Sequence, residues 1–184
     1  RSELDHLISN FEKVDKQQIL EWLDKFVRLN TYEISIPGLK DQELVPPGKT
    51  GLIISFLSEY NLFKKIKEAG WLDEFVTEME NRVLDVIADS VYPMLKDKII
   101  TRFSFTPLSI ENRVGSSEGA ITGWAFQESM PVINKIQNSA ASVFTPLPSV
   151  YQAGQWTYSP AGVPMSILTG KLAADQVLKT LKKH

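Results

Sequence analysis

Small residues and prolines near the end of the chain form a turn whose backbone could hold a ligand. Gly154 follows a short β-rich segment, and Gly162 directly precedes Val163-Pro164, where a helical pattern begins. Glycine lets the backbone come close to another group, and proline at the start of a helix costs little because no hydrogen bond is lost there. The free N–H groups of that helix would point at whatever occupies the turn. The segment therefore predicts a binding site made largely of backbone.

Two aromatic side chains beside this turn have two interpretations. Ala153 and Ala161 leave room for a flat ligand, and Trp156 and Tyr158 lie between the two glycines, where they could wall that ligand. A plain strand–turn–helix connection explains the same spacing, and aromatic side chains pack in cores as readily as against ligands. The residues alone leave both interpretations open.

Other kinds of site find no support in the sequence. The chain has no cysteine, and its two histidines lie near or at the termini, which fits neither a catalytic triad nor a metal site. No carboxylate cluster has the spacing of metal ligands. Residues 46–51 contain Gly-Lys-Thr but lack the upstream glycine of a phosphate-binding loop. We predict no catalytic side chain, and the net charge of -2 predicts no nucleic-acid partner.

The elements that would position the turn are those of an α+β protein with a mixed or largely antiparallel sheet and packed helices. Asp15 and Gln18 form a capping pair before an apolar helical stripe, and residues 73–91 form the clearest helix. A closing helix is expected over residues 163–181. The segment 51–60 is expected to be a strand buried on both faces and paired antiparallel with 32–37. Further strands are expected at 99–107 and 150–153.

Length and composition fit one globular domain and a piece of another. The 184 residues are 43% hydrophobic and 23% charged, which allows a sizeable core. Prolines gather around residues 142–149, so we expect domains at 1–148 and 149–184. No apolar run approaches a membrane span and no signal peptide is evident, which predicts a cytoplasmic protein whose membrane contact, if any, is peripheral. The start at Arg1 suggests that a longer chain precedes it.

An ordered set of motifs resembles the phytoene desaturase family of FAD-dependent oxidoreductases, which includes carotenoid isomerases and retinol saturases. Residues 150–175, VYQAGQWTYSPAGVPMSILTGKLAAD, resemble the family's C-terminal flavin signature of strand, glycine, proline-glycine turn and small-residue helix. Residues 36–55, with Asp and then Pro-x-Gly-Lys before a second strand, resemble an upstream segment of the family. Residues 91–124 resemble its Tyr-Pro helix end and Thr-Pro region.

The resemblance implies a cofactor and a substrate class. It implies FAD, held at the following positions: Gly154, Gln155, Ala161, Gly162, Val163, Pro164 and Met165. It implies a large apolar substrate of the polyene or isoprenoid kind, for which we expect contacts from Trp124, Phe126, Trp156 and Tyr158. Ala161 departs from a common family glycine, and Gln155 from a common acidic residue. The family's N-terminal dinucleotide fold is absent from this sequence.

Three functions remain open from the sequence. The chain resembles the C-terminal part of an oxidoreductase that acts on double bonds, with 149–184 as the end of its FAD-binding domain. A flavin-dependent isomerase without net redox change, or a non-enzymatic module that binds an apolar ligand or protein, are the alternatives. Alone, the chain is expected to be inactive, to lose FAD, and to self-associate through apolar residues of its closing helix.

Overall fold

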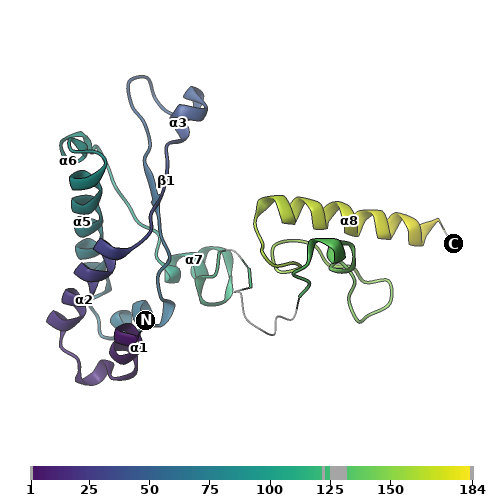
Figure 1. Cartoon of the computed structure of the whole chain (residues 1–184), viewed down its shortest axis with the longest axis horizontal. Helices are drawn as coiled ribbons and strands as arrows, with labels where there is room; N and C mark the ends of the chain where they lie inside the picture. Colours follow the sequence, from purple (N-terminus) through teal and green to yellow (C-terminus); the bar gives the residue numbers. More distant parts are fainter. Residues whose placement is uncertain (1, 122, 125–131, 183–184) are drawn as a thin grey trace. The chain divides into compact units, whose positions relative to one another are not determined.

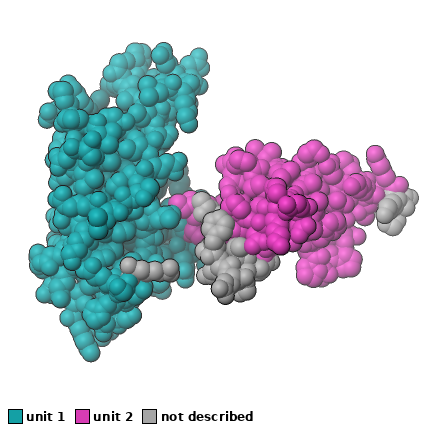
Figure 2. Space-filling model, viewed as in Figure 1, with its two compact units in different colours: residues 1–119 teal, residues 120–184 magenta. Residues whose placement is uncertain are grey.

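The computed structural model describes residues 2–121, 123–124 and 132–182, which form two compact units, 1–119 and 120–184 (Figures 1 and 2). The class is α+β, as predicted: helices dominate and one small antiparallel sheet is present. The predicted domain boundary at 148/149 is the point where a flavin-binding domain would begin. The division into two compact units does not test where such a domain begins, so the boundary stays a prediction.

The first unit is a helical layer with a two-stranded ribbon. Its elements in chain order are α1 (Ser2–Ser9), η1 (Phe11–Lys13), α2 (Lys16–Leu29), β1 (Glu33–Ser35), α3 (Pro37–Lys40), η2 (Gln42–Leu44), β2 (Ile53–Ser55), α4 (Tyr60–Glu68), α5 (Leu72–Ser90), α6 (Leu95–Lys98), α7 (Pro107–Val114) and η3 (Ser117–Gly119).

Helix α2 begins where the capping pair predicts and packs through its apolar stripe. The Asp15 carboxylate accepts a hydrogen bond from the Gln18 N–H at 2.8 Å, and the Gln18 side chain accepts one from the Asp15 N–H at 3.0 Å. This reciprocal pair satisfies two N–H groups that the helix leaves free. The apolar stripe of α2 packs against α5, whose own stripe recurs every fourth residue. Buried residues of both helices and of α4 form the core of this unit.

The ribbon confirms the predicted antiparallel pair but corrects its length and burial. Ile34 of β1 lies opposite Ile54 of β2, and both pack against the core. The predicted strand at 51–60 is wrong in its extent, since β2 covers only Ile53–Ser55 and Ile53 is 51% exposed. A ribbon of two strands has helices on one face only, so alternate side chains face solvent.

The predicted strand at 99–107 is also wrong. These residues form no strand and pair with no described strand, and Pro107 already begins α7. Phe103 is 77% exposed and Phe105 is 56% exposed. Their rings contact each other edge to face at 5.7 Å. The β-rich composition was not sufficient, because a strand requires a neighbouring strand that local composition cannot supply.

The second unit consists of a short helical turn, extended connections and one long helix. Its named elements are η4 (Ile136–Ala141) and α8 (Val163–Leu181). Helix α8 has the predicted bounds, whereas the predicted strand at 150–153 is reduced to a single bridge between Phe144 and Tyr151. No helix among the residues described here combines the length and apolar content needed to cross a membrane.

The α2–α5 core predicts a clear difference between two leucines of one helix. Leu23 of α2 is 0% exposed, whereas Leu29 at the end of α2 is 86% exposed. Leu23→Ala should lower the free energy of unfolding by about 2–5 kcal/mol, because it leaves a cavity in the core. Leu29→Ala should change it by less than about 0.5 kcal/mol. Urea unfolding followed by circular dichroism measures both, and equal losses would contradict this core.

Tyr32 predicts a pH dependence at the alkaline end. Its hydroxyl donates to the Val27 carbonyl at 2.6 Å, and burial raises its pKa from 10.0 to about 12. Because the unfolded chain releases this proton first, the contribution of Tyr32 to stability is complete below pH 10 and is lost as the pH rises toward about 12. Tyr32→Phe should cost about 1 kcal/mol at neutral pH and flatten this alkaline fall. Thermal unfolding from pH 8 to 12 compares the stability of the two proteins. Parallel profiles of stability against pH would show that Tyr32 does not cause the alkaline fall.

Candidate functional site

The turn before α8 has the open backbone that the sequence predicts. Gly154 has φ 107° and Gly162 has φ 127°, conformations that other residues rarely adopt. A Cβ built on Gly154 would have no described atom within 4 Å, and one built on Gly162 would meet only Cδ of Pro164, at 3.9 Å. Neither glycine is therefore required by crowding within the described chain. Space remains beside both for another group.

The N-terminus of α8 presents N–H groups at this turn that have no partner in the described part of the chain. Gly162 is the N-cap and offers no side chain, and the first bond of the helix runs from the Ser166 N–H to the Gly162 carbonyl at 2.9 Å. Among the residues described, the N–H groups of Val163 and Met165 donate to no partner. Pro164 has no N–H, so it removes one unpaired donor from the first turn. The two remaining donors are available to an acceptor outside the described chain.

Thr169 is a site residue that the sequence analysis did not find. Its side chain is 0% exposed, and its hydroxyl oxygen accepts a hydrogen bond from the Gly154 N–H at 3.0 Å. The same hydroxyl donates back to the Met165 carbonyl, at 2.8 Å. The sequence does place Thr169 four residues after Met165 in a predicted helix. A threonine in a helix commonly donates to the carbonyl four residues earlier. That signal does not reveal the contact with Gly154.

The predicted aromatic residues divide into exposed and buried ones. Trp124 and Trp156 come together: the Trp124 indole N–H donates to the Trp156 carbonyl at 2.9 Å, and their rings meet edge to face at 5.5 Å. Trp124 is 40% exposed and Trp156 is 38% exposed, so both present indole surface. Tyr158 is 3% exposed and forms a bridge with Ile133, which places it inside the unit. Phe126 lies outside the described residues.

Gly123 holds the segment of Trp124 against the turn. A Cβ on Gly123 would lie 2.5 Å from the Gln155 carbonyl oxygen and 2.9 Å from Cβ of Ala161, and its φ is 78°. Both contacts are to predicted cofactor positions at either end of the turn. Only glycine allows this approach. The sequence around Gly123 gives no signal of this role, because the role depends on a contact between distant parts of the sequence.

Inside the turn, Ser159 is 0% exposed, and its hydroxyl has no hydrogen-bond partner among the described residues. The open space beside Gly154 and Gly162, together with two N–H groups that have no described partner, would suit a heteroaromatic ring with hydrogen-bonding edges. An isoalloxazine ring is of this kind. The seven predicted cofactor positions remain predictions.

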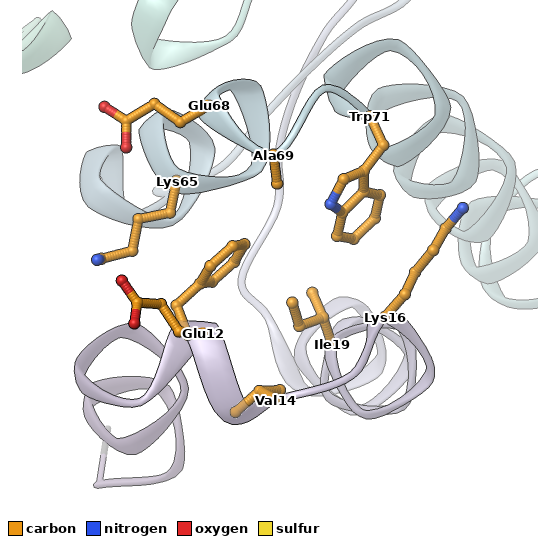
Figure 3. Close-up of a pocket in the computed structure, with 9 residues that line it drawn as sticks. Glu12, Val14, Lys16, Ile19, Lys65, Glu68, Ala69 and Trp71 are labelled. Atoms are coloured by element: carbon orange, nitrogen blue, oxygen red, sulfur yellow. The ribbon is translucent and has the colours of Figure 1, made fainter.

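A separate hollow lies in the first unit and has a structural explanation. It measures about 520 Å³ and lies between the start of α2 and the connection from α4 to α5, with Trp71 and Ile19 among its lining residues (Figure 3). The Lys16 amino group lies over the Trp71 ring, 5.1 Å from its centroid, and pairs with Glu74. Lys65 lies similarly over the Phe11 ring, at 5.9 Å. These cations cover aromatic surface, and acidic residues at the rim give the hollow no preference for one sign of charge.

Comparison with known proteins covers most of the chain. No protein-family model and no solved structure matches. Curated relatives include the 4,4'-diapophytoene desaturases (4,4'-diaponeurosporene-forming) of Staphylococcus aureus strains Newman and USA300. Each is 24% identical over 152 residues, which cover 82% of this chain. The chain spans only 29% of the length of these relatives.

These relatives confirm the resemblance to the phytoene desaturase family that the motifs indicate. The matched residues cover most of the chain, so the similarity does not rest on the turn alone. The chain is therefore a distant relative of the phytoene-desaturase-like carotenoid oxidoreductases.

Proposed function

We propose that the chain is part of an FAD-dependent desaturase and supplies the cradle for the flavin ring. The observation that carries this proposal is the turn between Gly154 and Gly162, whose backbone is open and whose helix donors are unpaired. That turn lies in the segment that resembles the flavin signature of the family. The named relatives are desaturases, and desaturation is a redox reaction that needs an electron acceptor.

Each residue of the cradle has a role that its backbone or side chain can perform. A bound FAD would supply a hydride acceptor. The Val163 and Met165 N–H groups, at the positive end of α8, would stabilise negative charge on the bound ring. Gly154 and Gly162 would allow a close approach of the backbone to that ring. Gln155 offers an amide that can hydrogen-bond the ribityl chain without adding charge.

The substrate of the proposed enzyme is a long apolar isoprenoid. The relatives act, by their names, on 4,4'-diapophytoene, a compound of this class. Trp124 and Trp156 present indole surface beside the turn, and such surface binds conjugated or branched hydrocarbon through dispersion and exclusion of water. No charged group is needed for this recognition. We assign these two tryptophans to substrate contact, while buried Tyr158 supports the turn from inside.

The domain division follows from the same proposal. Residues 149–184 would complete a flavin-binding domain, and residues 1–148 would belong to the substrate side of the enzyme. Apolar residues of α8 are exposed in the described chain, with Ile167 at 68% and Leu181 at 67%. Self-association of the separate chain would cover them.

A glycine pair distinguishes flavin contact from backbone strain. Gly162→Ala places a Cβ in the proposed ring site and also strains a backbone at φ 127°. Gly70→Ala in the first unit also places a side chain on a backbone with positive φ, at 80°, where a Cβ would meet nothing within 4 Å. Both changes should cost about 1–3 kcal/mol of stability. Only Gly162→Ala should weaken FAD binding, by about tenfold or more. Flavin fluorescence titration measures this in the intact protein, by which we mean the full-length enzyme of which this chain is proposed to be a part.

Equal FAD affinity in the two glycine variants would refute the cradle at Gly162. The plain strand–turn–helix connection would then be the better account of the turn. The isomerase would be favoured by two results in the absence of oxygen. The bound flavin would not be bleached by 4,4'-diapophytoene, and the substrate would nevertheless change its double-bond geometry. Failure of the intact protein to bind any flavin would favour the non-enzymatic module.

The tryptophan pair predicts a substrate effect. Trp156→Ala should raise KM for 4,4'-diapophytoene about tenfold with a smaller change in kcat, because it removes apolar contact that is equal in the ground and transition states. Phe103→Ala is the matched control, since Phe103 also belongs to an exposed edge-to-face pair. Product formation at steady state, with an added artificial electron acceptor to reoxidise the flavin, measures both constants. Identical KM values in wild type and Trp156→Ala would remove Trp156 from the substrate site.

A further inference from the structure

Helix α8 is attached to its unit by hydroxyl groups as well as by half-buried apolar residues such as Leu168 and Leu172. Among its described residues, Thr169 is the one buried side chain. Several of its large apolar side chains are exposed, including Val163 at 72% and Ile167 at 68%. The hydrogen bonds of its hydroxyl groups therefore contribute to the position of α8.

Two of these contacts lie on one face of the helix. Thr169 accepts from the Gly154 N–H, and the hydroxyls of Thr180 and Tyr151 share a hydrogen bond of 2.7 Å. Thr169 and Thr180 are separated by about three turns, so they lie on the same side of the helix. Both reach the segment that runs from Tyr151 to Gly154. One contact fixes the N-terminal half of α8 and the other fixes its C-terminal end.

The contact at Thr169 joins the two sides of the proposed cradle. On one side is the Gly154 N–H, 3.0 Å from the hydroxyl oxygen. On the other side is the first turn of α8, whose Met165 and Ser166 carbonyls lie 2.8 Å and 3.2 Å from the same oxygen. A hydroxyl has one proton to donate and lone pairs to accept, so it can bond both sides at once. A valine of the same shape would fill the space and make neither bond.

We propose that Thr169 is a positioning residue that fixes the separation between Gly154 and the first turn of α8. The proposal rests on the proposed flavin cradle and names the group that sets its width. Apolar contacts tolerate small shifts, whereas a hydrogen bond holds both distance and direction. Through this bond Thr169 holds the Val163 and Met165 donors at a constant distance from Gly154. Thr169 itself touches neither cofactor nor substrate.

Three variants of the intact protein test this role. Thr169→Val removes the hydroxyl at the cradle, Thr169→Ser keeps it, and Thr180→Val makes the same change on the same face of α8 but away from the turn. Amide exchange of Gly154, followed by NMR without flavin, reports the bond directly. Thr169→Val should speed this exchange about tenfold or more, because a partly buried donor loses its partner. Thr169→Ser and Thr180→Val should leave it within about twofold.

FAD titration and the flavin reduction potential then separate positioning from stability. Thr169→Val should weaken FAD binding about tenfold and lower the potential, because displaced donors stabilise the reduced ring less. Thr180→Val should destabilise the helix while leaving both flavin properties unchanged, and Thr169→Ser should restore them. Unchanged Gly154 exchange in Thr169→Val, or equal flavin effects of the two valine variants, overturns the proposal. Absence of FAD binding in the unsubstituted protein overturns the proposed function, and the exchange data still decide whether Thr169 positions Gly154.

Discussion

The arrangement of the second unit depends on one backbone contact that only glycine permits. Gly123 has a positive φ, and a Cβ on it would overlap the Gln155 carbonyl. Backbone therefore meets backbone at a point where a core would place side chains. Close backbone contacts leave N–H groups that require partners. The Thr169 hydroxyl accepts from the Gly154 N–H, and among the described residues the N–H groups of Val163 and Met165 have no partner.

The first unit follows a different principle, and the contrast explains the division of roles. Leu23, Ile66 and Phe75 are almost fully buried, so α2, α4 and α5 are held by apolar stripes that tolerate small adjustments. In the second unit the buried side chains are mostly polar: Ser142, Val143, Thr157, Tyr158, Ser159 and Thr169. Polar interiors are directional, and each unsatisfied group is costly. That property suits a place where atoms must stay at set distances.

Local sequence signals predicted the helices well and the strands poorly. The capping pair at Asp15 and the proline at the start of α8 depend on neighbours in sequence, so they were readable. The strands at 51–60 and 99–107 failed because pairing depends on distant residues. The site shows the same limit. Small residues marked the turn, but the roles of Gly123 and Thr169 arise from contacts across many positions, which no spacing rule reveals.

The helix ends show where the chain leaves charge uncompensated. Asp15 caps α2, Glu59 caps α4, Thr106 caps α7, and α5 begins with Asp73 and Glu74. These groups offset the positive pole or satisfy free N–H groups. Helix α8 has a glycine cap and no acidic residue in its first turn, although Lys179 compensates its opposite pole. The chain thus compensates the end of α8 far from the turn and leaves the positive pole at the other end without a compensating group among the described residues. Under the proposed function, that pole is the part of the turn that would stabilise the negative charge of a reduced flavin ring.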